Sequence, residues 1–150
     1  MSTLERAISI AADVHQGRND KAGMDHVLHQ VRVMMRLDTQ EERMTAMLQH
    51  VIEENVSWSI ERFRQEGFSE EVLAAVESVT RRSDEAYDVF LRRVARNPIG
   101  INVELAGLTE NSDLSRVSNP TAADHERVAR YRSAIAAIQK ILSSLTPQKR

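Results

Sequence analysis

The sequence predicts an all-α protein, a single helical bundle of about seven or eight helices. Glycine and proline, which interrupt helices, number only 5 and 3 among 150 residues. Apolar residues recur at spacings of three and four, the period of an amphipathic helix. Serine or threonine precedes several of these stripes, as expected of helix N-caps. We expect one domain over residues 1–145 and a frayed tail over 146–150.

The first two predicted helices flank a polar loop. Ser2-x-x-Glu5 has the form of a capping box, and the apolar stripe behind it predicts a helix that ends near His15. A loop of polar residues and glycines follows from Gly17 to Gly23. A second helix is expected beyond it, because apolar residues again share one stripe. The stripe consists of Val27, Leu28, Val31, Met34 and Met35.

Thr39-x-x-Glu42 is a second capping box and predicts the start of a third helix. We expect this helix to continue through the segment Ala46–Glu54, because the apolar spacing does not change there. Its apolar residues are Met44, Met47, Leu48, Val51 and Ile52.

Three shorter helices are predicted in the middle of the chain. One covers Ser59 to Glu66 and stops at Gly67, and Ser69 caps the next. Ser83 is expected to cap a further helix, which Asn97-Pro98 ends because the residue before a proline disfavours the helical conformation.

The segment Ile99–Leu105 fits two periods. Its apolar residues alternate as in a strand, and they also fit a helix that continues to Leu108. A lone strand would have no partner, so a helix is preferred. Asn119-Pro120-Thr121 marks a turn and an N-cap, and a long last helix reaches Leu145.

The composition excludes several functional classes. A formal net charge of −2 does not favour a nucleic-acid backbone or a membrane surface. The absence of cysteine excludes disulfides and thiolate chemistry. No window approaches the roughly 18 apolar residues of a membrane span, and charges stand where a signal peptide needs an apolar run. We therefore expect a cytoplasmic protein without nucleic-acid or membrane partners.

Polar side chains with metal-binding chemistry gather in the third predicted helix. Gln49, His50, Glu53 and Glu54 are neighbours at helical spacing, and imidazole with carboxylate can ligate a divalent metal. The alternative is a solvated face, because these residues lie opposite the apolar stripe and an amphipathic helix needs a polar side.

The order of several segments resembles the HD-domain phosphohydrolases, specifically the small single-domain branch similar to RelA/SpoT-type guanosine tetraphosphate hydrolases. His15–Gly23 resembles the His-x-Gly-Gln-x-x-Lys-x-Gly segment of that family, and Val27–Val33 resembles its Tyr-Ile-x-His-Pro-x-x-Val segment. Ala46–Glu54 resembles Leu-Leu-His-Asp-x-x-Glu-Asp, and Val103–Asn111 resembles Val-Lys-Leu-Ala-Asp-x-x-x-Asn. The resemblance implies an HD-domain-like fold in which Val103–Asn111 is helical.

The resemblance also implies a degenerate metal site. Active relatives hold one divalent metal, usually manganese, with a His, a His-Asp pair and a distant Asp. Here His29 keeps the first position, Gln49-His50 replaces the pair, and Gly107 replaces the Asp. His50 remains a candidate ligand beside His29. We therefore expect no bound cofactor, with manganese or another divalent metal as the alternative.

Other matched positions concern catalysis and nucleotide binding. Glu53 and Glu54 match the acidic pair that orients water or moves protons in relatives, whereas Glu104 reverses the charge of the family lysine. Lys21 and Asn111 match positions near the nucleotide pocket. The ligand implied is a guanosine nucleotide or another phosphate compound.

Three hypotheses follow. The first is an inactive HD-domain-like protein that acts as a nucleotide-binding or regulatory module. The second is an active metal-dependent phosphohydrolase with a site rebuilt from His26, His29, His50 and Glu53 or Glu54. The third is a purely structural helical protein that forms a homodimer.

Overall fold

The computed structural model describes residues 1–19 and 26–145, and it confirms the predicted all-α bundle. The expected frayed tail at 146–150 and most of the Gly17–Gly23 loop lie outside these residues. Within the described ranges the helices are α1 (Leu4–Val14), α2 (His26–Met35), α3 (Gln40–Leu48), α4 (Val51–Glu54), α5 (Ile60–Gln65), α6 (Glu70–Val79), α7 (Tyr87–Val94), α8 (Gly100–Asn111) and α9 (Ala122–Leu145).

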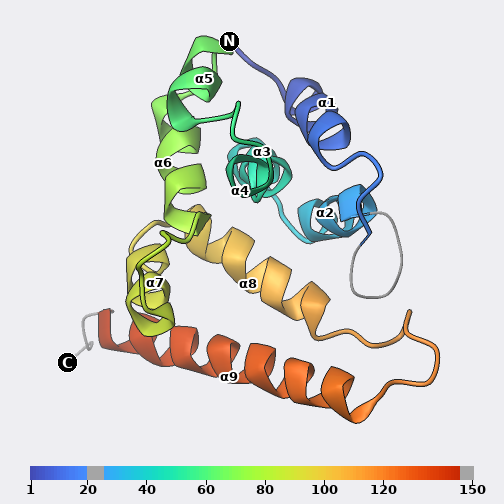
Figure 1. Ribbon diagram of the computed structural model, residues 1–150. Helices are drawn as coiled ribbons and strands as arrows, with labels where there is room; N and C mark the ends of the chain where they lie inside the picture. The colour runs from blue at the N-terminus through green and yellow to red at the C-terminus, as the bar shows by residue number, and fades with distance from the viewer. Residues whose placement is uncertain (20–25, 146–150) are drawn as a thin grey trace.

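Helix α3 forms the centre of the molecule. It packs against α1, α2, α6 and α8, and Figure 1 shows it end-on with these helices around it. Its residues Ala46, Met47 and Leu48 are completely buried. The apolar stripe predicted for this segment therefore faces a core on nearly all sides, and burial of such side chains is the main favourable term in folding.

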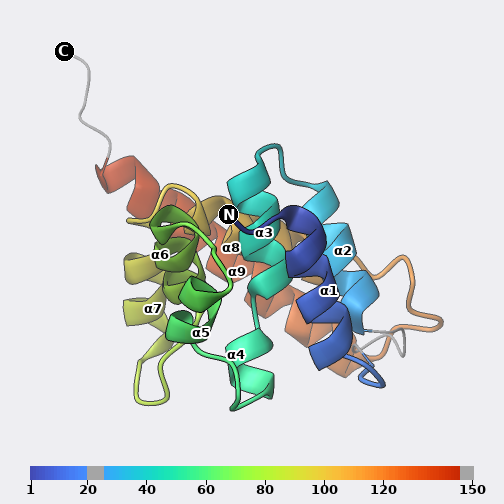
Figure 2. The ribbon, with the colours of Figure 1, turned by 90° about the horizontal axis from the view of Figure 1, so that it is seen from above.

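Helices α8 and α9 form a second layer beside this centre. They run in opposite directions and are joined by a long loop at one end, as Figures 1 and 2 show. Helix α9 also packs against α7, and its residue Ile138 is completely buried. At the start of α8, a Cβ atom on Gly100 would lie 2.0 Å from Ser78 Oγ. The close approach of α8 to α6 at this point therefore requires a residue without a side chain.

Several predicted N-caps are confirmed and two are wrong. The capping box of Thr39 with Glu42 is present, and Ser69 accepts the Val72 N–H. The N-cap of α1 is Thr3 rather than Ser2, so Ser2 and Glu5 do not form a capping box.

The second wrong cap is Ser83. Helix α7 begins at Tyr87, and Ala86 is its N-cap without a side-chain hydrogen bond. Arg93 instead fixes the preceding loop, because it donates to the Thr80 carbonyl and pairs with Glu85 at 2.8 Å. The ambiguous segment Ile99–Leu105 is helical and belongs to α8, as preferred from the sequence.

The third predicted helix is broken, which corrects the expectation of a continuous helix through Ala46–Glu54. Helix α3 ends at Leu48, and His50 has a φ of 71°, in the left-handed region. In an unbroken helix the Ala46 carbonyl would accept the backbone N–H four residues later. Here the buried Gln30 side chain donates to that carbonyl at 2.9 Å and to the Gln49 carbonyl at 3.3 Å. The Gln30 amide thus satisfies backbone groups that the break exposes.

Candidate functional site

The break between α3 and α4 sends the four polar side chains of this segment in different directions. Gln49 is buried, with 5% of its surface exposed, and its Nε2 donates to Glu104 Oε2 at 3.2 Å. The hypothesis of a fully solvated face is therefore wrong for Gln49. His50 and Glu53 are partly exposed and bond to each other, with 3.1 Å between Nδ1 and Oε2. Glu54 points elsewhere, towards α1 and α2.

Most of the residues singled out by the resemblance line one cavity of about 230 Å³. His29 comes from α2, Glu53 from α4, and Asn111 from the end of α8. Lys21 lies outside the described residues, and Glu54 is not part of the lining. The predicted residues in the lining are His29, Gln49, His50, Glu53, Glu104, Gly107 and Asn111.

One wall of this cavity holds three ionisable side chains, His50, Glu53 and Glu104, that shift one another's pKa values. Burial of Glu104 raises the pKa of its carboxyl to about 7, and the charge of Glu53 adds to this, although His50 and Gln49 oppose it. Burial of His50 opposes its ionisation, but the hydrogen bond to Glu53 and the charges of Glu53 and Glu104 outweigh it and raise the pKa of the imidazole. The same hydrogen bond lowers the pKa of Glu53. The His50 imidazolium and the Glu53 carboxylate therefore stabilise each other, and Glu104 adds a negative charge only above about pH 7.

At the positions that the resemblance assigns to metal ligands, Gln49 and Gly107 offer a weak donor and none. His29 offers an imidazole, but the Gln49 amide is a weak neutral donor whose NH₂ already bonds Glu104. His50 is hydrogen-bonded to Glu53. At Gly107 an added Cβ would meet nothing within 4 Å, so the fourth ligand position is open space.

A second cavity of about 430 Å³ adjoins the first. The two share His29, His50, Asn111 and Tyr131 in their walls. The additional lining is mainly basic or amide side chains, and among them the sequence had singled out only His26 as a candidate site residue. Its members include Asn19, His26, Arg32, Arg116 and Arg127.

The basic character of the larger cavity is organised by Glu110. This buried carboxylate accepts from Arg32 at 2.9 Å, from Arg36 at 2.8 Å and from Arg116 at 3.0 Å. Burial opposes its ionisation, but the hydrogen bonds from Arg36 and Arg32 outweigh this and lower the pKa of Glu110. Asp113, 3.6 Å from Arg116, is the other carboxylate of the cluster. Three guanidinium groups thus face two carboxylates, and two of the three, those of Arg32 and Arg116, line the larger cavity.

The sequence carried one signal for this second cavity. Arg32 follows His29 by three residues and therefore shares its face of the helix. Tyr131 and Arg127 could not be found in this way, because α9 reaches the site through its tertiary packing on α7 and α8.

Comparisons with known proteins do not place the chain in a family. No family model matches the sequence, and no curated protein matches it. Among the helices of the described ranges, none combines the length and the apolar character needed to cross a membrane.

Proposed function

We propose that this chain is an HD-domain-like protein that binds a guanosine nucleotide or a similar phosphate compound and does not hydrolyse it. The observation that carries the proposal is the pair of adjoining cavities, which share His29, His50, Asn111 and Tyr131. The larger cavity, at about 430 Å³, lies within the range of roughly 300–1,000 Å³ typical of ligand sites.

Charge supports a phosphate ligand in the larger cavity. Arg116 is partly exposed, with 41% of its side chain accessible, so its guanidinium can contact a ligand while it stays near Glu110. Arginine recognises phosphate through two parallel hydrogen bonds. The amide of Asn111 and the ring of Tyr131 lie in the shared wall, where a nucleoside would meet hydrogen-bonding and aromatic partners.

The chemistry of the smaller cavity argues against hydrolysis. Relatives in the resembled family use the metal to lower the pKa of bound water and to offset phosphate charge. Here two ligand positions hold Gln49, whose amide already bonds Glu104, and Gly107, while Glu53 contributes negative charge and Glu104 does so above about pH 7. Without a cation, these carboxylates would repel the phosphate that the reaction must attack.

The alternative is a hydrolase with a remodelled site. The observation in its favour is that His29, His50 and Glu53 line one cavity, so two imidazoles and a carboxylate are available there. A location in the cytoplasm remains part of the proposal for either function.

Calorimetric titration of the chelator-treated protein with guanosine tetraphosphate tests the proposal. We expect binding that weakens about tenfold or more in Arg116→Gln, since a hydrogen bond to a charged group is lost. The matched control is Arg132→Gln, an exposed arginine of α9 outside both cavities. Absence of binding would refute the proposal, whereas pyrophosphate release with added manganese would favour the hydrolase.

A further inference from the structure

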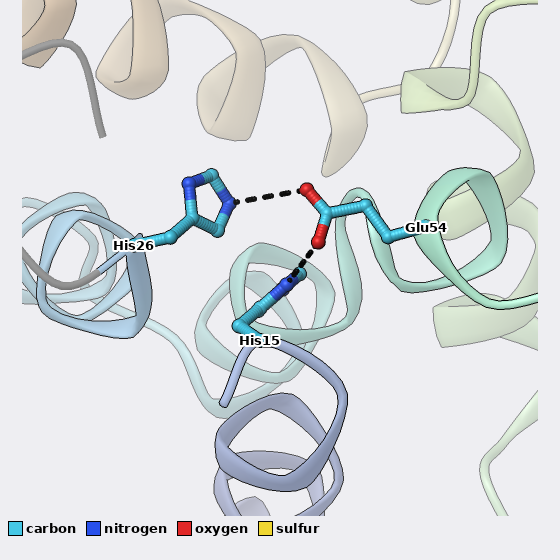
Figure 3. Close-up of side chains that lie close together, drawn as sticks. All are labelled: His15, His26 and Glu54. Carbon is cyan, nitrogen blue, oxygen red and sulfur yellow. Dashed lines mark hydrogen bonds and ion pairs between the residues drawn. The ribbon is translucent and has the colours of Figure 1, made fainter. Parts of the chain in front are cut away.

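A cluster of two histidines and one glutamate lies where α1, α2 and α4 meet. His15 directly follows α1, His26 begins α2, and Glu54 ends α4. Figure 3 shows both imidazoles directed at the carboxylate, one towards each oxygen. His15 Nδ1 lies 2.7 Å from Glu54 Oε2, and His26 Nε2 lies 3.8 Å from Glu54 Oε1. One ligand atom from each of the three residues lies within 4.8 Å of the other two.

This cluster is separate from the positions that the family resemblance assigns to a metal. It contains none of His29, Gln49, His50 or Gly107. Within the described ranges it is the one group of three or more His, Asp or Glu side chains close enough to hold an ion together. The sequence did not single out His15 as a metal ligand, although it was expected to end the first helix and to open the segment His15–Gly23 of the family resemblance.

A second observation points to a ligand at this place. The His15 side chain is completely buried, and its Nε2 has no hydrogen-bond partner in the described part of the chain. Buried polar atoms are nearly always paired, and an orphaned one commonly marks a bound water or ion. An imidazole binds one ion through one nitrogen, so a metal held through Nε2 would compensate this atom and leave Nδ1 hydrogen-bonded to Glu54.

We propose that His15, His26 and Glu54 bind a divalent transition metal, with Zn²⁺ as the ion best suited to them. Two imidazoles and one carboxylate are a known zinc ligand set. With zinc–ligand bonds of about 2.0–2.2 Å in a tetrahedron, ligand atoms stand about 3.4 Å apart. The three ligand atoms of the cluster lie within 4.8 Å of one another, so the widest spacing exceeds this value by at most about 1.4 Å and side-chain adjustment would complete the site.

The site would have an open position beside the larger cavity. Three protein ligands leave one place of a tetrahedral zinc free for water or an exogenous ligand. His26 also lines the larger cavity, so the ion would stand at its edge. The proposed zinc site does not depend on nucleotide binding, and either proposal can fail without the other.

Arg18 opposes the metal in the present arrangement. Its Nε lies 3.2 Å from Glu54 Oε2, so the guanidinium already neutralises the carboxylate. About half of the Arg18 side chain is exposed, at 52%, so it can move into solvent when an ion binds. Removal of the Arg18 guanidinium should therefore strengthen zinc binding. If Glu54 does not bind zinc, removal of Arg18 should leave the zinc affinity unchanged.

The test is competition for Zn²⁺ between the purified protein and a chromophoric chelator. We expect one zinc per chain. Glu54→Gln and His26→Asn should each lower the affinity by more than the roughly 10- to 100-fold typical of an outer-shell change. Arg18→Gln should raise the affinity several-fold. His29→Asn is the matched control, because this imidazole lies one turn along α2 with its ring 6.0 Å from that of His26.

The outcomes separate the proposal from its competitors. Zinc that is lost in Glu54→Gln and His26→Asn but kept in His29→Asn supports the site. Zinc that is lost in His29→Asn and kept in His26→Asn overturns it, because the ion then belongs to the smaller cavity. Failure to compete for zinc at micromolar protein overturns it as well. Circular dichroism is the check that each variant is folded, and we expect the partly exposed Glu54 and His26 to tolerate substitution better than the buried His15.

Discussion

Two glutamates on one helix meet opposite environments. Glu104 and Glu110 both belong to α8, and neither is fully exposed. Glu110 accepts hydrogen bonds from three arginines, and its pKa is lowered. Glu104 has Gln49 as its hydrogen-bond partner and His50 and Glu53 as charged neighbours, and its pKa is raised to about 7. Burial alone would raise both pKa values, so the partners decide the direction.

The comparison explains how one helix serves two adjoining cavities. Glu104 lines the smaller cavity and Glu110 the larger one. The first therefore gains an acidic wall, and the second gains a set of arginines that one carboxylate holds in place. An anionic ligand is drawn to the Glu110 end and repelled by the Glu104 end whenever that carboxyl is ionised.

The largest loss of stability is expected from Glu110→Gln. The change leaves Arg32, Arg36 and Arg116 close together without their shared counter-charge, which should cost about 2–3 kcal/mol of unfolding free energy. Urea denaturation near pH 7 measures this. Because the pKa of Glu110 is lowered, its stabilisation is present above the ordinary value of 4.5 and is lost as the pH falls below it.

Asp113→Asn is the matched control for this variant. Asp113 also lies near Arg116, but 34% of its side chain is exposed, so the loss should stay below about 1 kcal/mol. Equal losses in the two variants would show that Glu110 does not organise the arginines.

Glu104→Gln is expected to change the unfolding free energy in the opposite direction to Glu110→Gln, by stabilising the protein at high pH. A carboxyl whose pKa is raised from 4.5 to about 7 stabilises the fold fully below pH 4.5 and loses this stabilisation as the pH rises to about 7. At pH 8 the neutral amide should therefore make the protein more stable, by about 1–2 kcal/mol. Urea denaturation at pH 4.5 and pH 8 checks the sign.

A nuclear magnetic resonance titration of His50 gives an independent readout of this change. The charge of Glu104 helps to raise the pKa of His50, so the pKa of the imidazole should fall in Glu104→Gln. An unchanged His50 titration, or a gain in stability that is the same at both pH values, would contradict the coupling.

Local periodicity was enough to predict much of this fold. The apolar stripes and the caps at Thr39 and Ser69 predicted where helices lie, because these signals come from residues within a few positions of each other. The same reasoning missed the break at His50. That segment lacks glycine and proline, and the Gln30 side chain that replaces its backbone bonds comes from another helix.

The candidate site shows the same limit. One cavity is lined by four residues that the family resemblance had singled out in separate segments, namely His29, His50, Glu53 and Asn111. The pairing of His15 with Glu54 could not be predicted, because it joins residues 39 positions apart and depends on the turn that redirects α4. A side chain's direction after a non-helical residue cannot be read from helical spacing.

The smallest effect is expected at Gly107, which lies on α8 between the two glutamates. An added Cβ meets nothing within 4 Å, so Gly107→Ala should gain the intrinsic helix preference of alanine, about 0.5–1 kcal/mol, without a clash. Gly100→Ala, on the same helix, is the matched contrast, because its Cβ would lie 2.0 Å from Ser78 Oγ and should destabilise the protein. Thermal unfolding of both variants measures the difference. A loss of stability in Gly107→Ala would mean that the smaller cavity is closed around this glycine. The open space inferred beside α8 between Glu104 and Glu110 would then be wrong.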